Sequence, residues 1–254
     1  MKILVACEMS GIVRDAFIAR RHDAVSCDLL PSERPGPHIT GDVLPLLDQP
    51  WDMVIAFPPC TYLCSSGLHW TVRGKRDPKL TEDALDFVRA LLSANSPKIA
   101  LENPTGCIST RIRKYDQKIQ PWQFGHDASK GTCLWLKNLP ELKHTKIVPP
   151  KGFSLVKYAF ECESCPDCGE PFCMEHDMHY SECDCIGPTQ DDVYRVDVEG
   201  YEFAKRGEDS VRPVWGNQTK SGQNKLGPSD DRATIRSRTY QGIADAMAEQ
   251  WGGL

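Results

Sequence analysis

Short apolar runs alternate with amphipathic segments through the first half of the chain. An unbroken apolar run predicts a strand that is buried on both faces, as in a parallel sheet. Such runs occupy residues 2–7, 23–30, 52–57 and 98–104, and 130–137 is a further candidate. Apolar residues at 84, 87, 88 and 91 indicate a helix over 81–94, and a similar spacing indicates one over 12–21. The pattern predicts an α/β fold with a parallel sheet covered on both faces.

The pattern changes near residue 160. A Cys-rich stretch and then a long polar stretch follow, until Ile243, Met247 and Trp251 form one apolar stripe of a C-terminal helix. Four parts are therefore expected: an α/β core over 1–159, an acidic Cys/His-rich insert over 160–199, a basic polar loop over 200–238, and a helix over 239–254 that packs back on the core.

The composition is that of a soluble globular protein, since 254 residues can bury a sizeable core. No apolar run is as long as a membrane span, and the N-terminus does not resemble a signal peptide. We expect a cytoplasmic monomer without a membrane partner. Twelve cysteines in such a chain favour metal or thiol chemistry over disulfides.

The net charge of −5 conceals two opposite regions. Residues 160–199 hold 12 Asp and Glu and one Arg, a charge of −11, so the rest of the chain carries −5 − (−11) = +6. Within that rest, residues 203–238 hold eight Lys and Arg against four Asp and Glu. The basic part can bind a nucleic-acid backbone, although the whole-chain charge suggests otherwise.

Ligands of open parallel sheets bind at the carboxyl ends of the strands, where several chemically useful residues are expected. The turn Cys7–Gly11 could let a cofactor approach a helix N-terminus. Asp28 is placed to accept the hydroxyls of a ribose, and Asp42 could accept from an adenine amino group. For both acids, the capping of a local turn is an equally good explanation.

The sequence "FPPC" places a thiol at the end of a predicted strand. Pro58 and Pro59 fix the backbone before Cys60, and "ENP" sets Glu102 at the matching height one strand later. A thiolate beside a carboxyl group can add to C6 of a cytosine while the acid supports N3. C5 then becomes nucleophilic and can take a methyl group from a sulfonium donor.

Together, "PPC", "ENP" and the N-terminal strand with its glycine turn resemble the DNA cytosine-5 methyltransferases, and above all the compact methyltransferase-like proteins of phages and prophages. The likeness continues through "QPWQFGHDASKGTCLWLKNLP", "WGNQTKSGQNKLGPS" and "RSRTYQGIADAMAEQW". It implies a Rossmann-like methyltransferase fold, S-adenosylmethionine as donor, a flipped base in DNA and action in the host cytoplasm. It implies Cys60 as nucleophile, Glu102 as partner of N3, and Pro59 and Asn103 as orienting residues. The cofactor would be lined by Cys7, Glu8, Ser10, Gly11, Asp28, Asp42 and Pro58.

The chain departs from the family pattern at several positions. Thr61 replaces the usual Gln, Pro104 replaces the usual Val, and the first glycine motif keeps one glycine. Two alternatives therefore stay open. One keeps the fold with another donor or acceptor, such as a carboxymethyl-type donor or a free nucleotide. The other is a non-catalytic, zinc-containing nucleic-acid-binding protein.

The stretch 162–185 offers six Cys and two His in 24 residues, with spacing typical of zinc sites. We expect one or two structural Zn²⁺ ions, held first by Cys165, Cys168, Cys183 and Cys185, with Cys173, His176 and His179 as substitutes or a second site. The insert occupies the place of the family's target recognition, yet its acids would repel phosphates. It is therefore expected to brace the basic loop that follows.

The DNA contacts are expected from basic and amide side chains in three places. The segment after the nucleophile is basic, the resemblance suggests contacts after "ENP", and the loop after the insert is basic and polar. The candidates are Arg73, Lys75, Gln123, Lys130, Gln223, Asn224, Lys225, Arg236 and Arg238. Cys64 is expected to be a packing or turn residue, and Cys7, Cys27, Cys107 and Cys133 are expected to be small buried side chains.

Overall fold

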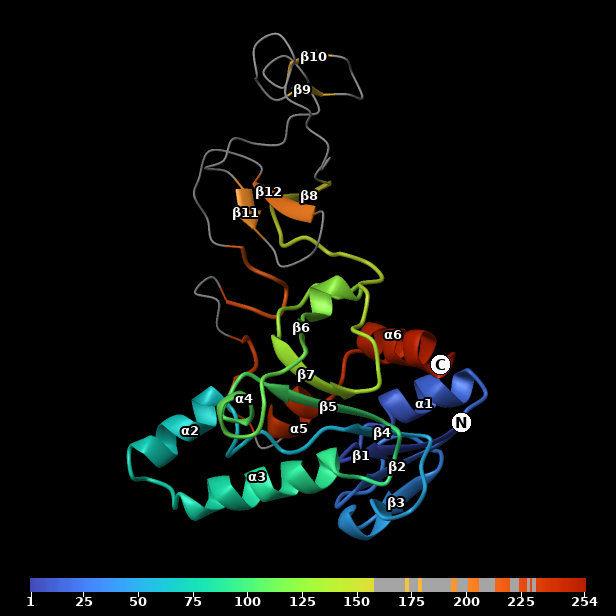
Figure 1. The fold of residues 1–254 in the computed structure, drawn as a ribbon. Helices are drawn as coiled ribbons and strands as arrows, with labels where there is room; N and C mark the ends of the chain where they lie inside the picture. Colours follow the sequence, from blue (N-terminus) through green and yellow to red (C-terminus); the bar gives the residue numbers. More distant parts are fainter. Residues whose placement is uncertain are drawn as a thin grey trace. The chain divides into compact units, whose positions relative to one another are not determined.

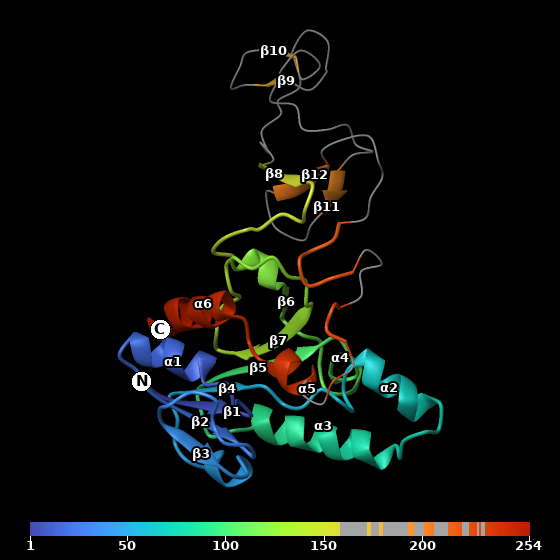
Figure 2. The same ribbon diagram turned by 180° about the vertical axis from the view of Figure 1, so that it is seen from behind.

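A computed structural model describes residues 1–157, 172–173, 178–179, 193–195, 201–205, 213–219, 224–227, 229 and 232–254. The chain divides into two compact units, residues 1–146 with 226–254, and residues 147–225. Each unit is considered by itself. The first unit contains the sheet and the helices that position the candidate site (Figures 1 and 2).

The first unit alternates strands and helices as the apolar runs predict. Its elements are β1 (Lys2–Ala6), α1 (Ile12–Ala19), β2 (Asp23–Asp28), β3 (His38–Thr40), η1 (Leu44–Leu46), β4 (Met53–Ala56), α2 (Ser65–Val72), α3 (Lys79–Leu92), β5 (Lys98–Pro104), α4 (Ile108–Arg111), β6 (Gln117–Ile119), η2 (Pro121–Gln123), β7 (Thr132–Lys137), α5 (Arg232–Ser237) and α6 (Gln241–Gly252). The strand predictions for β1, β2, β4, β5 and β7 and the helix predictions for α1, α3 and α6 are confirmed.

The seven strands form one sheet in the order β3-β2-β1-β4-β5-β7-β6. Neighbours from β3 to β5 pair in parallel, whereas β7 pairs antiparallel with both β5 and β6. The expectation of an all-parallel sheet is therefore wrong at β7, which follows β6 through a turn and η2 instead of a full crossover helix. A mixed α/β sheet of this kind is consistent with the methyltransferase-like fold that the resemblance implies.

The sheet is covered on both faces, which explains the unbroken apolar runs. Ile3, Val5 and Ile55 face a core shared with Phe17 of α1 and Met247 of α6. On the other face, the alternate residues Leu4, Ala6 and Val54 pack with the apolar stripe of α3. Figure 1 shows α1 and α6 side by side on one face and α3 on the other. The carboxyl ends of β1 to β5 meet at one edge of this three-layer unit.

The second unit contains the short strands β8 (Phe153–Lys157), β9 (Phe172–Cys173), β10 (Met178–His179), β11 (Val193–Arg195) and β12 (Tyr201–Lys205). β12 pairs antiparallel with β8 and β11, and β9 pairs antiparallel with β10. The stretch 200–238, expected as a loop, thus includes β12 and, in the first unit, the helix α5.

Candidate active site

The turn after β4 is tied to the end of β5. Asn103 is fully buried, and its side-chain amide donates a hydrogen bond to the carbonyl oxygen of Pro58 at 2.8 Å. On the other side of β4, Phe57 N–H donates to the carbonyl oxygen of Ala6 at 2.9 Å. The backbone that leads into Cys60 is therefore fixed from both neighbouring strands.

The segment after Cys60 packs backbone to backbone on the segment after β5. Leu63 accepts a hydrogen bond from Cys107 N–H at 2.9 Å, and Ser65 N–H donates to the carbonyl oxygen of Thr105 at 3.0 Å. A Cβ on Gly106 would overlap the carbonyl oxygen of Leu63, so this approach requires glycine. The contact sets the position of Cys60 relative to the carboxyl end of β5.

Cys60 lies in the electrostatic field of Glu102, as the prediction of a shared site requires. Its thiol is half-buried, and its pKa is raised by a hydrogen bond to Cys64, by burial and by the charge of Glu102. The ammonium of Lys130 acts in the opposite direction and lowers the same pKa. The charges of a carboxylate and an ammonium group thus act on the thiol at the sheet edge, and the shared site stays a prediction.

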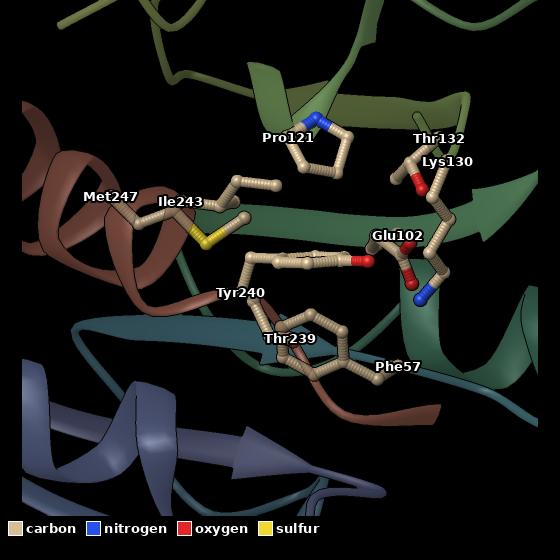
Figure 3. Close-up of a pocket in the computed structure, with 9 residues that line it drawn as sticks. All are labelled: Phe57, Glu102, Pro121, Lys130, Thr132, Thr239, Tyr240, Ile243 and Met247. Carbon is tan, nitrogen blue, oxygen red and sulfur yellow. The ribbon is translucent and has the colours of Figure 1, made fainter. Parts of the chain in front are cut away.

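A pocket lies on the α6 side of this edge. Glu102 and Lys130 line its polar side, and aromatic and apolar side chains close the rest (Figure 3). The full lining is Phe57, Glu102, Pro121, Lys130, Thr132, Thr239, Tyr240, Ile243 and Met247. In Figure 3 the Tyr240 hydroxyl points toward the Glu102 carboxylate, and the Lys130 ammonium lies beside it. Carboxylate, hydroxyl and ammonium groups thus lie together on one side of the pocket, whose lining does not include Cys60.

Lys130 reaches this pocket from the segment before β7. Its backbone N–H donates to Gln120 Oε1 at 2.9 Å, and its ammonium donates to the carbonyl oxygen of Arg236 at 2.8 Å. The predicted DNA contact Gln123 instead caps η2, where its Oε1 accepts from Gln120 N–H at 2.7 Å. Lys130 therefore lines the pocket and is tied to Gln120 and Arg236, whereas Gln123 has a local structural role.

The turn between β1 and α1 contains a buried carboxylate. Glu8 is 4% exposed, and its Oε1 accepts from Ser10 Oγ at 2.8 Å and from Val13 N–H at 3.0 Å. Burial raises the pKa of this carboxyl group, and its Oε2 has no hydrogen-bond partner among the described residues. Cys7 and Gly11 adopt left-handed conformations with φ of 57° and 71°. The turn thus folds tightly over the start of α1, and Glu8 Oε2 is a buried acceptor without a donor among the described residues.

The predicted ribose and adenine ligands meet at the ends of β2 and β3. The pKa of Cys7 is raised to about 12 by burial and by the nearby charges of Asp28, Cys27 and Asp42. Each of the two aspartates also caps a local turn, since Asp28 Oδ1 accepts from Leu30 N–H at 3.0 Å and Asp42 Oδ1 from Leu44 N–H at 3.0 Å. Cys7 itself is half-buried, so the expectation that its side chain is fully buried is wrong.

The residues at this edge fit the adenosine of the S-adenosylmethionine that the resemblance implies. Each aspartate uses one oxygen in its turn bond, which leaves the other for a hydroxyl or amino group. Leu29 and Leu30, which follow Asp28, are 75% and 51% exposed, so apolar surface lies beside these acceptors. Acceptors next to exposed apolar surface suit a flat, polar-edged base.

A buried arginine organises the loop beside these acids. Arg14 is fully buried and donates from its guanidinium to Ser26 Oγ, Ser32 Oγ and several carbonyl oxygens of the loop 34–37. Glu33 of the same loop receives a bidentate pair from Arg238 at 2.8 Å. Arg238, expected at a DNA phosphate, therefore has an intramolecular partner in this structure.

The other predicted DNA contacts are spread over both units. Arg73 and Lys75 are exposed just after α2, and the Lys75 ammonium lies 5.1 Å from the centre of the Trp70 ring. Arg236 is exposed on α5. Asn224 and Lys225 belong to the unit 147–225, where Lys225 Nζ donates to the carbonyl oxygen of Gly216 at 2.7 Å. Gln223 lies outside the described residues.

The predicted zinc ligands fall almost entirely outside the described residues. Cys165, Cys168, His176, Cys183 and Cys185 are among those not described. Cys173 and His179 belong to the paired strands β9 and β10, where Cys173 lies opposite Met178 and His179 opposite Phe172. The described part of the chain contains no cluster of three or more His, Cys, Asp or Glu that could hold a metal. Zinc therefore stays a prediction.

Sequence reasoning missed three parts of the site. Cys64 was expected to be a packing or turn residue; it does begin α2, but it also contacts the Cys60 thiol. The apolar side of the pocket, including Tyr240 and Phe57, comes from segments far apart in sequence. For Arg14, the sequence shows only a charged residue within an apolar helix pattern. For the contact between the two cysteines, the spacing of four residues between Cys60 and Cys64 is the signal that the sequence offers.

The described helices include none that is long and apolar enough to cross a membrane. Among known proteins, no family model and no curated protein matches the chain. A solved structure of a presumed DNA modification methyltransferase, encoded within an E. coli prophage, is similar with a TM-score of 0.36 and 15% identity. The match covers 53% of this chain and 45% of that one, so the chain spans less than half of the solved structure.

Proposed function

We propose that this protein transfers a methyl group from S-adenosylmethionine to C5 of cytosine in DNA. The observation that supports it is the grouping of Cys60, Glu102 and Lys130 at the ends of neighbouring strands, beside a pocket. A carboxylate in that position can hold the N3 edge of a cytosine while a thiolate attacks C6. This chemistry supports the proposal, and the sequence resemblance adds only short motifs to it.

In the proposed reaction the Cys60 sulfur forms a bond to C6, and electron density moves to N3, where Glu102 donates or shares a proton. The ring becomes an enamine whose C5 is nucleophilic. The ends of β1 to β3 would hold S-adenosylmethionine as the methyl donor. C5 takes the methyl group, so that the C5–CH3 bond forms, the sulfonium–CH3 bond breaks and S-adenosylhomocysteine leaves. A base then removes the C5 proton, the S–C6 bond breaks to release the thiolate, and N3 returns its proton to Glu102. Asn103 and Pro58 keep the sulfur in place throughout.

Lys130 has a defined task in this scheme. Its ammonium lies beside Glu102 in the pocket and favours the thiolate of Cys60 over the thiol. A fixed positive charge close to both groups stabilises negative charge as it moves from sulfur to the ring and back. Lys130 was expected to contact DNA, and we propose instead that it acts on the reacting groups.

The test uses purified protein, labelled S-adenosylmethionine and mixed-sequence DNA. We expect transfer by the wild type and loss of transfer in Cys60→Ser, with donor binding retained. DNA that carries 5-fluorocytosine should form a covalent adduct with the wild type. Fluorine replaces the C5 proton, so a base cannot remove it and the thiolate is not released. Retained turnover in Cys60→Ser would contradict the proposal, and so would the absence of an adduct.

The same assay separates the alternatives that the sequence left open. Mass spectrometry of the product base distinguishes a methyl from a carboxymethyl product when each donor is supplied in turn. Free cytidine nucleotides in place of DNA test the acceptor. DNA binding without transfer, for every combination of donor and acceptor, would support the non-catalytic alternative. Zinc, proposed for the insert 160–199, is tested separately by metal analysis of protein purified without chelators.

DNA binding is proposed to involve the basic residues after α2. No residue of α2 is buried, and Trp70, 41% exposed, stands next to Lys75 and Arg73. An exposed aromatic ring among cations is suited to a base and its phosphates. The N-cap of the helix, Cys64, comes four residues after the proposed nucleophile, so a strand of DNA held here would lie near the reacting sulfur.

A further inference from the structure

Cys60 and Cys64 lie one turn of backbone apart. Cys64 N–H donates to the carbonyl oxygen of Cys60 at 2.9 Å, and Leu63 N–H donates to the same oxygen at 3.0 Å. Residues four apart in a helical turn are separated by about 6 Å along its axis. Disulfides accept Cα separations of about 4.4–6.8 Å. The backbone therefore already holds the two cysteines at a distance that a disulfide can span.

The two sulfurs also interact with each other. A hydrogen bond between the thiols raises the pKa of Cys60 and lowers the pKa of Cys64, which additionally interacts with Ser66 Oγ at 3.3 Å and with the N–H of Gly67. Cys64 is the N-cap of the eight-residue helix α2, where a thiolate is favoured. The proton between the two sulfurs is therefore held more tightly by Cys60 than by Cys64.

The surroundings of the pair are rigid on the inner side and open on the outer side. Cys64 forms an isolated bridge with Gly106 and is 8% exposed, so its backbone is fixed against the end of β5. Cys60 is half-buried and is the more accessible of the two. An oxidant would thus meet the sulfur of Cys60 first, with a second thiol in contact behind it.

We propose that Cys60 and Cys64 form a reversible oxidation site, which a hydroperoxide closes to an intrachain disulfide and a dithiol reopens, and that closure stops group transfer. The second half of this inference rests on the proposed function, because it requires Cys60 to be the nucleophile. The first half depends on the thiol pair alone. The ligand class is small hydroperoxides, of which hydrogen peroxide is the probe.

The chemistry balances in two steps. The proton between the two sulfurs moves to Cys64, and the Cys60 thiolate attacks one peroxide oxygen; an S–O bond forms, the O–O bond breaks and hydroxide leaves. Hydroxide takes the proton from Cys64, whose thiolate attacks the Cys60 sulfur; the S–S bond forms, the S–O bond breaks and a second hydroxide leaves and is protonated by solvent. The two sulfurs lose two electrons to peroxide, which becomes two waters.

The test treats the full chain with hydrogen peroxide, blocks free thiols with N-ethylmaleimide and cleaves before Asp52 and Asp77. Cys60 and Cys64 are the only cysteines in the resulting peptide, residues 52–76. We expect this peptide to become lighter by two hydrogen atoms, to lose both maleimide adducts, and to regain them after dithiothreitol. A peptide that keeps both adducts, or carries separate sulfinic acids on both cysteines, would overturn the oxidation site.

Two variants sharpen the test. Cys64→Ser removes the resolving thiol, so peroxide should carry Cys60 on to sulfinic acid that dithiothreitol does not reverse. Cys107→Ser changes a neighbouring buried cysteine at another helix start and should close like the wild type. Closure in Cys64→Ser through some other cysteine would also count against the pair. The wild-type peptide decides the question even if a variant fails to fold.

Transfer activity measured on the same samples keeps the two proposals apart. Loss of transfer that follows closure and returns with dithiothreitol supports both. A fully closed peptide with unchanged transfer leaves the oxidation site standing and removes Cys60 as nucleophile. Transfer lost in Cys60→Ser, with no closure of the wild-type pair, leaves the proposed function standing and removes the oxidation site.

Discussion

The Asn103 side-chain amide donates a hydrogen bond to the Pro58 carbonyl oxygen at 2.8 Å, and this bond joins the end of β5 to the turn that carries Cys60. Both partners are shielded from water, so a lost donor leaves a buried carbonyl unsatisfied. Asn103→Ala should lower the free energy of unfolding by about 1–3 kcal/mol. It should also reduce transfer beyond the loss of folded protein, because Cys60 loses its support.

Denaturant unfolding and single-turnover rates measure these two effects. Asn95→Ala is the matched control, since Asn95 makes the same kind of bond, from its amide to the carbonyl oxygen of Asp48 at 3.0 Å, on an exposed residue. We expect the control to lose less than about 1 kcal/mol. Equal losses in the two variants would mean that burial of the Asn103 bond has no special importance.

Arg14 is the second residue whose removal should be costly. The guanidinium is fully buried and serves acceptors from β2 and from the loop 32–37. Arg14→Met should destabilise the protein by roughly 3 kcal/mol, because the buried Ser26 hydroxyl and several part-buried acceptors of the loop lose their donor at once. Arg20→Met, which breaks an exposed pair with Glu249, should change stability by less than about 1 kcal/mol.

The loop itself reports the same change. In Arg14→Met we expect limited proteolysis within residues 29–37 to become faster than global unfolding allows. Proteolysis that tracks global stability alone would argue against a specific role of Arg14 in holding this loop.

His126 gives the protein a pH dependence. The backbone N–H of Gly242, in the first turn of α6, donates to His126 Nε2 at 2.9 Å, so the ring must be neutral at that nitrogen. Burial lowers the pKa of His126 below its ordinary 6.5, against a smaller opposing effect of Asp245. The unfolded chain therefore takes up a proton first as pH falls, and stability that is complete above pH 6.5 is lost as pH falls through the lower pKa of the folded protein.

Thermal unfolding of wild type and His126→Gln, measured across this pH range, tests the assignment. Glutamine supplies an acceptor that does not titrate, so the difference between the two curves should be flat above pH 6.5 and shrink below it. His22, whose pKa is also lowered, contributes equally to both proteins and cancels. A constant difference at all pH values would exclude His126 as the titrating group.

Cys64 controls the reactivity of Cys60. The hydrogen bond between the two thiols is the largest cause that raises the pKa of Cys60. In Cys64→Ser this pKa should fall, and alkylation of Cys60 by iodoacetamide near pH 7 should become roughly tenfold faster for each unit of the fall. The rate is measured on the peptide 52–76, with Cys107→Ser as control. An unchanged pH midpoint would show that burial and Glu102 set the pKa by themselves.

The basic residues after α2 should contribute to DNA affinity through phosphates. The double variant Arg73→Ala, Lys75→Ala removes two exposed cations, so the slope of log affinity against log salt should fall by about 2. Lys79→Ala is the control, because that lysine is already paired with Asp83 on α3. Fluorescence anisotropy at several salt concentrations measures both. An unchanged slope in the double variant would place the DNA elsewhere on the protein.

The sequence predicts the strands and helices that bury apolar side chains. It does not predict the elements whose position is set by contacts with other parts of the chain. β1, β4 and β5 are legible because both faces of each are covered by helices. β3 and β6 are three residues long and leave no periodic signal. α2 has no buried residue, so it lacks an apolar stripe; its start is fixed instead by the turn at Cys60 and Cys64. Local patterns could not anticipate such a helix.

The candidate site divides in the same way. Cys60, Glu102 and Asp28 could be found because each lies at or just after the end of a recognisable strand, whereas Asp42 was marked only by the glycine before it. The pocket side of Glu102 could not, since Phe57, Thr132 and Tyr240 come together through packing between β4, β7 and the segment before α6. The contact between Cys60 and Cys64 depends on a backbone turn after Pro59. The two prolines are compatible with such a turn but do not require it.

The reversed direction of β7 changes which residues lie at the edge of the candidate site. Thr132, at the start of β7, lies opposite Pro104, at the end of β5. One strand that runs against its neighbours thus delivers the residues that precede it, Lys130 among them, to a rim otherwise supplied by residues that follow their strands. The ammonium of Lys130 thus comes from a residue that precedes its strand, and residues that follow strands are not the full set at this edge.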